Sequence, residues 1–113
     1  MVTIYHNPRC SKSRETLALL EANGVKPAIV HYLETPPDRK TLQILLKKLG
    51  MRSVRQLMRT KETLYKTLRL EEADEAQLLE ALTAHPALLE RPVVINGDRA
   101  RIGRPPEAVL EIL

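Results

Sequence analysis

The chain has a single cysteine, no tryptophan and no phenylalanine, and three tyrosines are its only large aromatic side chains. One cysteine excludes an internal disulfide and is typical of a reducing compartment, so we expect a cytoplasmic protein. The scarcity of aromatic rings argues against a single-strand nucleic-acid binder, which stacks bases on such rings. No run approaches about 18 consecutive apolar residues, which excludes a membrane-spanning helix. The first residues have the pattern of a strand, so we expect no targeting segment.

The charge of the chain is mildly positive and evenly spread. Its 113 residues include 18 Lys and Arg against 14 Asp and Glu, for a net charge of +4, and 43% are apolar. This composition is typical of a folded chain with one core, and we expect a single domain over residues 1–113. The basic residues form no run that would follow a nucleic-acid backbone. We therefore expect a monomer with no nucleic-acid or membrane partner, while a small anionic substrate remains open.

The first third of the chain has the pattern of strand, helix and strand. Residues 2–5 predict a strand. The helix that follows is capped by Ser11 or Ser13 and stops at Asn23–Gly24. Residues 28–33 predict the second strand. A right-handed crossover would make these two strands parallel neighbours.

The middle of the chain predicts helices only. Four leucines between residues 42 and 49 repeat at helical spacing before Gly50 ends the helix. Residues 53–68 predict two short helices. Asp74, with Gln77 three residues later, has the pattern of a capping box for a helix to about residue 84.

The last third of the chain predicts a hairpin and a helix. Residues 93–95 and 99–102 form the hairpin, joined by Asn96–Gly97, a pair that favours the type I′ turn. Pro105–Pro106 begin the final helix, at a position that suits proline. Strands therefore occur at both ends of the chain with helices between. This order predicts an α/β fold in which one sheet has helices on its faces.

The sequence points to Cys10 as its reactive position, in the loop between the first strand and the first helix. Backbone N–H groups and the positive end of the helix dipole favour a thiolate there. Arg9, Lys12 and Arg14 add positive charge, and Ser13 can donate a hydrogen bond to the sulfur. A lone cysteine can also be a small buried apolar side chain. The charged neighbours of Cys10 favour the reactive thiolate.

The spacing around Cys10 excludes several familiar cysteine sites. Arg14 follows after three intervening residues, whereas tyrosine phosphatases have a Cys-x5-Arg loop. Ser13 stands where a Cys-x-x-Cys motif would have its second cysteine, so any disulfide on Cys10 must form with another molecule. One cysteine and three scattered histidines have no zinc-ligand spacing, and we expect no metal.

Four segments resemble the glutaredoxin-coupled arsenate reductase family, in order and over essentially the whole chain. They are His6–Arg14 (HNPRCSKSR), His31–Pro37 (HYLETPP), Glu90–Val94 (ERPVV) and Ile102–Pro106 (IGRPP). Together they are specific, and the chain is most similar to a short branch of that family. Lys12 stands beside the thiol where established members have small, uncharged residues. The resemblance implies a thioredoxin-like fold: a mixed sheet of about four strands, with a helical insertion between β-α-β and β-β-α halves.

The resemblance also implies a mechanism. Cys10 matches the nucleophile of the family, which attacks arsenate to form a thiol–arsenate adduct. Glutathione, as co-substrate, then reduces the arsenic to arsenite, glutaredoxin resolves the mixed disulfide, and no cofactor is bound. Arg59, Arg91 and Arg104 match the arginines that bind the oxyanion. Arg91–Pro92 falls where this fold has a cis-proline beside the cysteine.

Arginine and histidine have a physical reason to be at such a site. Guanidinium N–H pairs match the oxygens of arsenate, although each arginine can also be an ordinary surface charge. His6 matches a family histidine thought to assist the thiol. Its charged form would stabilise a thiolate, or a hydrogen bond from its ring would shape the loop, and both alternatives stay open. We assign no function to His31 or His85.

Two other functions stay open. A glutathione-dependent reductase of another oxidised substrate would use the same groups. The Spx-type thiol-switch proteins, which bind RNA polymerase, share the fold, and fold alone never decides function. They sense oxidation with a Cys-x-x-Cys pair, whereas this chain has Cys10 and Ser13. Protection of Cys10 from alkylation by an anion would separate the enzyme from the binding protein.

Overall fold

The structure is a computed structural model that describes residues 1–113. The chain forms two compact units: Met1–Thr35 with Arg91–Leu113, and Pro36–Glu90. The first unit contains the sheet, and the second is the predicted helical insertion. A single domain over the whole chain stays a prediction. None of the helices combines the length and the apolar character that crossing a membrane requires.

The sheet of the first unit has four strands in the order β2-β1-β3-β4. They are β1 (Val2–Tyr5), β2 (Ala28–Val30), β3 (Val93–Asn96) and β4 (Arg99–Ile102). β1 pairs with β2 in parallel and with β3 antiparallel, and β3 and β4 form the predicted hairpin. The prediction of an α/β, thioredoxin-like fold with a mixed four-stranded sheet is confirmed.

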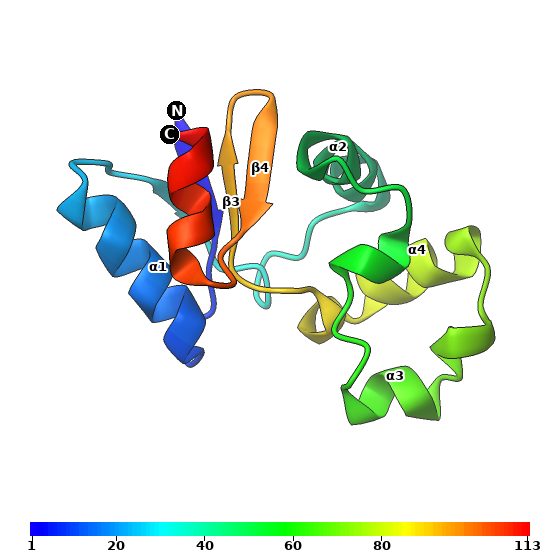
Figure 1. The fold of residues 1–113 in the computed structure, drawn as a ribbon. Coiled ribbons are helices and arrows are strands. Elements are labelled where there is room, and N and C mark those ends of the chain that lie inside the picture. The colour runs from blue at the N-terminus through cyan, green and yellow to red at the C-terminus, as the bar shows by residue number, and fades with distance from the viewer. The chain divides into compact units, whose positions relative to one another are not determined.

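One apolar cluster joins this sheet to two helices, α1 (Ser11–Ala22) and the 3₁₀ helix η4 (Pro106–Ile112). Its fully buried members come from the sheet and from both helices: Ile4, Leu20, Val94, Val109 and Ile112. Burial of each such side chain stabilises the fold by about 1.5–3 kcal/mol. α1 and η4 pack against each other, at opposite ends of the colour scale (Figure 1). The cluster thereby holds α1 and η4 against the strands.

Two local predictions in this unit were wrong. The second strand ends at Val30 rather than Leu33, because the carbonyl of His31 accepts hydrogen bonds from both Glu34 and Thr35 N–H and closes a turn. The cap of α1 is Cys10, not Ser11 or Ser13, and its side chain makes no capping hydrogen bond.

The hairpin turn also differs from the prediction. Asn96 pairs with Arg99 as part of the ladder, so the two loop residues are Gly97 and Asp98. Only Gly97 has a positive φ, at 61°, which is the pattern of a type II′ turn rather than type I′. The Asn96 side chain donates to the carbonyl of Ile112 instead, at 2.6 Å, which ties the hairpin to η4.

The second unit consists of helices. They are α2 (Arg39–Leu49), η1 (Val54–Leu57), α3 (Thr63–Thr67), η2 (Leu70–Glu72), α4 (Glu75–Ala84) and η3 (Pro86–Leu88). Gly50 ends α2 in the left-handed conformation. The capping box of Asp74 and Gln77 at the start of α4 is confirmed, as are the two short helices predicted for residues 53–68.

Candidate active site

Cys10 lies at the N-terminus of α1, where the loop after β1 meets the helix. Its backbone N–H donates to the carbonyl of Asn7 at 3.0 Å, and its carbonyl accepts from Arg14 N–H at 3.0 Å. The residue is 8% exposed. The first turn of the helix and the preceding loop thus hold the sulfur in a fixed, nearly buried position.

Two arginines from the C-terminal part of the chain reach this sulfur. Arg104 Nη2 lies 3.8 Å from Cys10 Sγ, and Arg91 also forms a hydrogen bond with the thiol. The two arginines are linked, because Arg104 Nε donates to the carbonyl of Arg91 at 2.8 Å. The Arg91–Pro92 bond is cis, as predicted, and Arg104–Pro105 is cis as well. Through their contacts with the sulfur, residues 91 and 104 join residue 10 in one site.

The surroundings of Cys10 favour its charged form. Burial raises the pKa of the thiol, but several groups outweigh it: the hydrogen bond from Arg91, the backbone N–H groups of Ser13 and Lys12, and the charge of Arg91. The pKa of Cys10 is therefore below its ordinary value. Burial also disfavours the charge of Arg91, yet the pKa of Arg91 is raised, because Cys10 and Tyr32 stabilise the guanidinium.

His6 and Ser13 form a buried pair behind the thiol. His6 Nδ1 lies 2.6 Å from Ser13 Oγ, which also accepts a hydrogen bond from Asn7 N–H at 3.0 Å. Burial, followed by the charges of His31 and Arg14, lowers the pKa of His6. His6 is thus neutral near pH 7, which favours the loop-shaping alternative over the charged one. Ser13 supports the thiol through its backbone N–H, and its hydroxyl serves His6 and Asn7.

Two other cations near the start of α1, Arg14 and Lys12, have partners of their own. Arg14 Nη1 donates to the carbonyl of Pro8 at 2.9 Å, and Lys12 Nζ lies 3.5 Å from Glu15 Oε2. The contact of Arg14 with Pro8 holds the loop, since the side chain reaches back from the first helical turn, and its support of the thiolate stays a prediction.

Arg59 belongs to the second unit, Pro36–Glu90. Its guanidinium pairs with Glu62, with 2.6 Å between Nη1 and Oε1, and its backbone N–H donates to the carbonyl of Leu88. The assignment of Arg59 to the oxyanion site stays a prediction. An anion at this guanidinium would compete with the Glu62 carboxylate.

Tyr32 is the site residue that sequence reasoning missed. Its side chain is fully buried, and it acts electrostatically on Arg91 and Cys10. A signal for it did exist, because Tyr32 follows β2 closely, and β2 is the parallel neighbour of β1. The carboxyl ends of parallel strands meet at one edge of a sheet, so residues after β2 lie near the loop after β1.

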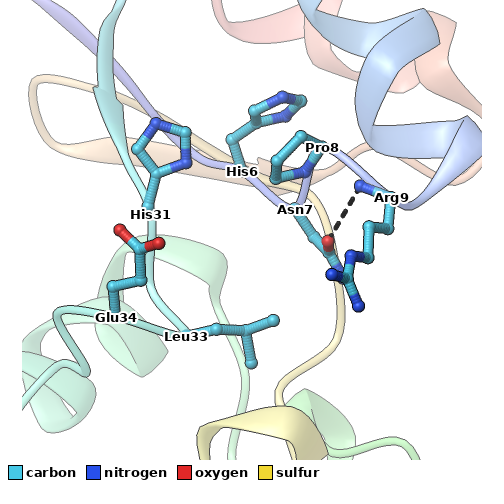
Figure 2. A pocket seen from close by; sticks show the side chains of 7 residues that line it. All are labelled: His6, Asn7, Pro8, Arg9, His31, Leu33 and Glu34. Carbon is cyan, nitrogen blue, oxygen red and sulfur yellow. Dashed lines mark hydrogen bonds between the residues drawn. The ribbon is translucent and has the colours of Figure 1, made fainter.

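A pocket of about 390 Å³ borders the loop that leads to Cys10. Its lining residues come from that loop and from the turn after β2: His6, Asn7, Pro8, Arg9, His31, Leu33 and Glu34 (Figure 2). The dashed line in the figure is the hydrogen bond from Arg9 N–H to Asn7 Oδ1, at 3.0 Å. The rings of His6 and His31 are 6.0 Å apart. The hydrogen bond between Arg9 and Asn7 thus holds the loop in shape, while the pocket leaves one side of the loop open.

This arrangement can attack and bind an oxyanion. A thiolate is the nucleophilic form of cysteine, and its pKa here favours that form. Guanidinium groups bind oxyanions through paired, charge-assisted hydrogen bonds. Fixed cations also stabilise charge that develops on an oxygen during the reaction. Cys10, Arg91 and Arg104 supply all three functions within one unit of the chain.

Comparisons with known proteins agree on one family. The model of the ArsC family matches residues 5–112. The arsenate reductase of Haemophilus influenzae is 60% identical, over 99% of this chain and 98% of that protein. A solved structure, the arsenate reductase from Vibrio cholerae, has a TM-score of 0.97 at 54% identity, covering 99% of this chain and 97% of that one. Another from Yersinia pestis has a TM-score of 0.96 at 60% identity, covering 99% and 100%.

Proposed function

The chain belongs to the ArsC family, and from this premise we propose that it is an arsenate reductase with Cys10 as its nucleophile. The observation that carries the proposal is the Cys10 thiol itself. The thiol is nearly buried, its pKa is lowered, and the guanidinium groups of Arg91 and Arg104 interact with it. Relatives named arsenate reductase support the substrate, since they match the chain over nearly its whole length.

In the first step, the Cys10 thiolate attacks the arsenic atom of arsenate. A sulfur–arsenic bond forms, and one oxygen of arsenate leaves as hydroxide or, after protonation, as water. Arg91 and Arg104 neutralise the remaining oxygens of the adduct. The thiolate must be free at the start of this step, and the low pKa of Cys10 meets that need.

In the second step, glutathione supplies the electrons. Its thiolate attacks the Cys10 sulfur and forms a sulfur–sulfur bond, and the electron pair of the sulfur–arsenic bond passes to arsenic. Arsenate is thereby reduced by two electrons and leaves as arsenite. The chain has no second cysteine, so this disulfide joins Cys10 to glutathione and needs an external thiol. Glutaredoxin, in a reducing cytoplasm, would remove the glutathione and return the thiolate.

The test is arsenate-dependent NADPH oxidation with glutathione, glutaredoxin and glutathione reductase present. Wild type should turn over, and Cys10→Ser should not, although it keeps the fold because only one atom changes. Glu107→Gln, at an exposed position on η4, is a suitable control and should retain full activity. Omission of glutaredoxin should stop wild-type turnover after the mixed disulfide has formed.

The pattern of failure separates the alternatives. If arsenate is not reduced but another oxidised substrate is, the site belongs to a glutathione-dependent reductase of that substrate. No turnover, together with a low thiol pKa and no protection of Cys10 by anions, would favour a thiol-switch binding protein. Arsenate reduction that persists in Cys10→Ser would refute the nucleophile.

A further inference from the structure

Two buried polar groups beside the thiol lack a hydrogen-bond partner. The Tyr32 side chain is 0% exposed, and neither its hydroxyl nor Arg91 Nε meets a partner in hydrogen-bond geometry. Folded proteins satisfy nearly all of their buried polar atoms, because an unsatisfied one costs free energy. These are the two such side-chain atoms in the protein, and both occur at the same place. A shared ligand explains both.

Electrostatic interactions link both residues to the Cys10 thiol. Burial raises the pKa of the Tyr32 hydroxyl, the charge of Arg91 and polar interactions with Arg91 and Asn7 lower it, and the charge of Cys10 raises it again. Arg91 in turn hydrogen-bonds the thiol. Because the net pKa of Tyr32 is above its ordinary value, the phenol keeps its proton at neutral pH. Tyr32 therefore presents an O–H donor next to a guanidinium and a nucleophile.

The missing partner must be an acceptor. Arg91 Nε–H can only donate, and the Tyr32 hydroxyl has its proton available. An oxyanion supplies several acceptor oxygens and is attracted by Arg91 and Arg104. We propose that the Tyr32 hydroxyl donates a hydrogen bond to an oxygen of the oxyanion bound at Cys10, beside the Arg91 Nε–H. The inference rests on the proposed function only in taking arsenate as that oxyanion.

Tyr32→Phe tests this proposal with little disturbance of packing. It removes only the hydroxyl and keeps the buried ring. Since that hydroxyl meets no protein partner in hydrogen-bond geometry, the Tm of the ligand-free variant should stay close to that of wild type. Tyr65→Phe is the matched control, because Tyr65 is also buried but accepts a hydrogen bond from Arg55 in the second unit.

The measurement is the concentration of anion that halves the rate of Cys10 alkylation by iodoacetamide. Arsenate and phosphate are each used as the probe, without any reductant. A hydrogen bond to a charged group accounts for about ten-fold to one-hundred-fold in affinity. Tyr32→Phe should therefore raise the half-protecting concentration of either anion by at least about ten-fold. Tyr65→Phe should leave it unchanged, and an unchanged value in Tyr32→Phe would overturn the proposal.

A positioning role for Tyr32 predicts a different result. If Tyr32 acted only by orienting the Arg91 guanidinium, its hydroxyl would have no effect on anion protection once Arg91→Lys has removed that guanidinium. Direct contact predicts that Tyr32→Phe weakens protection in the Arg91→Lys background as well. Loss of the effect there would refute direct contact.

Failure of the proposed function would look different again. A wild type that phosphate and arsenate protect, and that does not reduce arsenate, would refute the reductase while the Tyr32 comparison still applies. A wild type whose Cys10 neither anion protects would refute the oxyanion site and the role of Tyr32 together.

Discussion

Gly103 packs too closely against Thr16 and Pro92 to tolerate a methyl group. A Cβ atom at this position would lie 2.5 Å from Thr16 Oγ1 and 2.8 Å from Pro92 Cγ. Neither neighbour can yield easily. Thr16 is fully buried and donates to the carbonyl of Lys12 at 2.7 Å, and the proline ring is rigid. Gly103 N–H also donates to the carbonyl of Pro92 at 2.9 Å, which holds the two segments together.

Gly103→Ala should therefore destabilise the protein by overpacking. Insertion of a methyl group into a close-packed interior costs about 1–3 kcal/mol. With an unfolding entropy of about 240 cal/mol/K for a chain of this length, Tm should fall by about 4–12 °C. Gly103 contacts Pro92, which follows Arg91 in the chain, and it directly precedes Arg104. The same shift should therefore move both site arginines away from Cys10. The pKa of the thiol should then rise toward its ordinary value.

Thermal unfolding by circular dichroism and the pH profile of Cys10 alkylation measure these two effects. The double variant Thr16→Ala with Gly103→Ala removes the nearer contact and should recover part of the lost Tm. Gly103 has no positive φ, so backbone strain in alanine does not compete as an explanation. Unchanged Tm and thiol pKa in Gly103→Ala would refute the steric reasoning.

Three further predictions concern the thiol, the buried histidine and a helix cap. Arg91→Ala should raise the pKa of Cys10 in the alkylation profile and weaken arsenate protection by about 1–3 kcal/mol; an unchanged dissociation constant would remove Arg91 from the site. The lowered pKa of His6 means that the unfolded chain binds the proton more readily, so stability to urea should fall as the pH drops below about 6.5. His6→Gln should make that fall smaller, and an identical pH dependence would contradict it. Asp74→Ala removes the α4 cap and should cost about 1 kcal/mol in urea unfolding, whereas Glu80→Ala on the exposed face of α4 should cost less; equal losses would argue against the capping box.

Local patterns in the sequence determined most of the elements. The partners of the capping box, Asp74 and Gln77, are three positions apart, and Gly50 ends α2 within one turn, so short-range hydrogen bonds decide both. Cys10 was found in the same way, because its place between a strand and a helix is visible along the chain. Its position at the helix N-terminus is confirmed.

Local patterns failed where a distant segment decides the outcome. Asn96 favours a type I′ turn, yet it pairs in the ladder and donates to Ile112, sixteen residues away. The ladder and η4 together outweigh the preference of the Asn-Gly pair.

The sequence by itself determined the order of the elements, the position of the candidate nucleophile and, through family resemblance, the arginines to examine. Only the tertiary structure decided which groups reach the sulfur. Arg91 and Arg104 arrive there from the far end of the chain, and Tyr32 arrives from the turn after β2. The physical reason is that hydrogen bonding and charge act through space over a few ångströms. Such contacts between segments so distant in sequence exist only once the sheet has brought the ends of β1, β2 and β3 together.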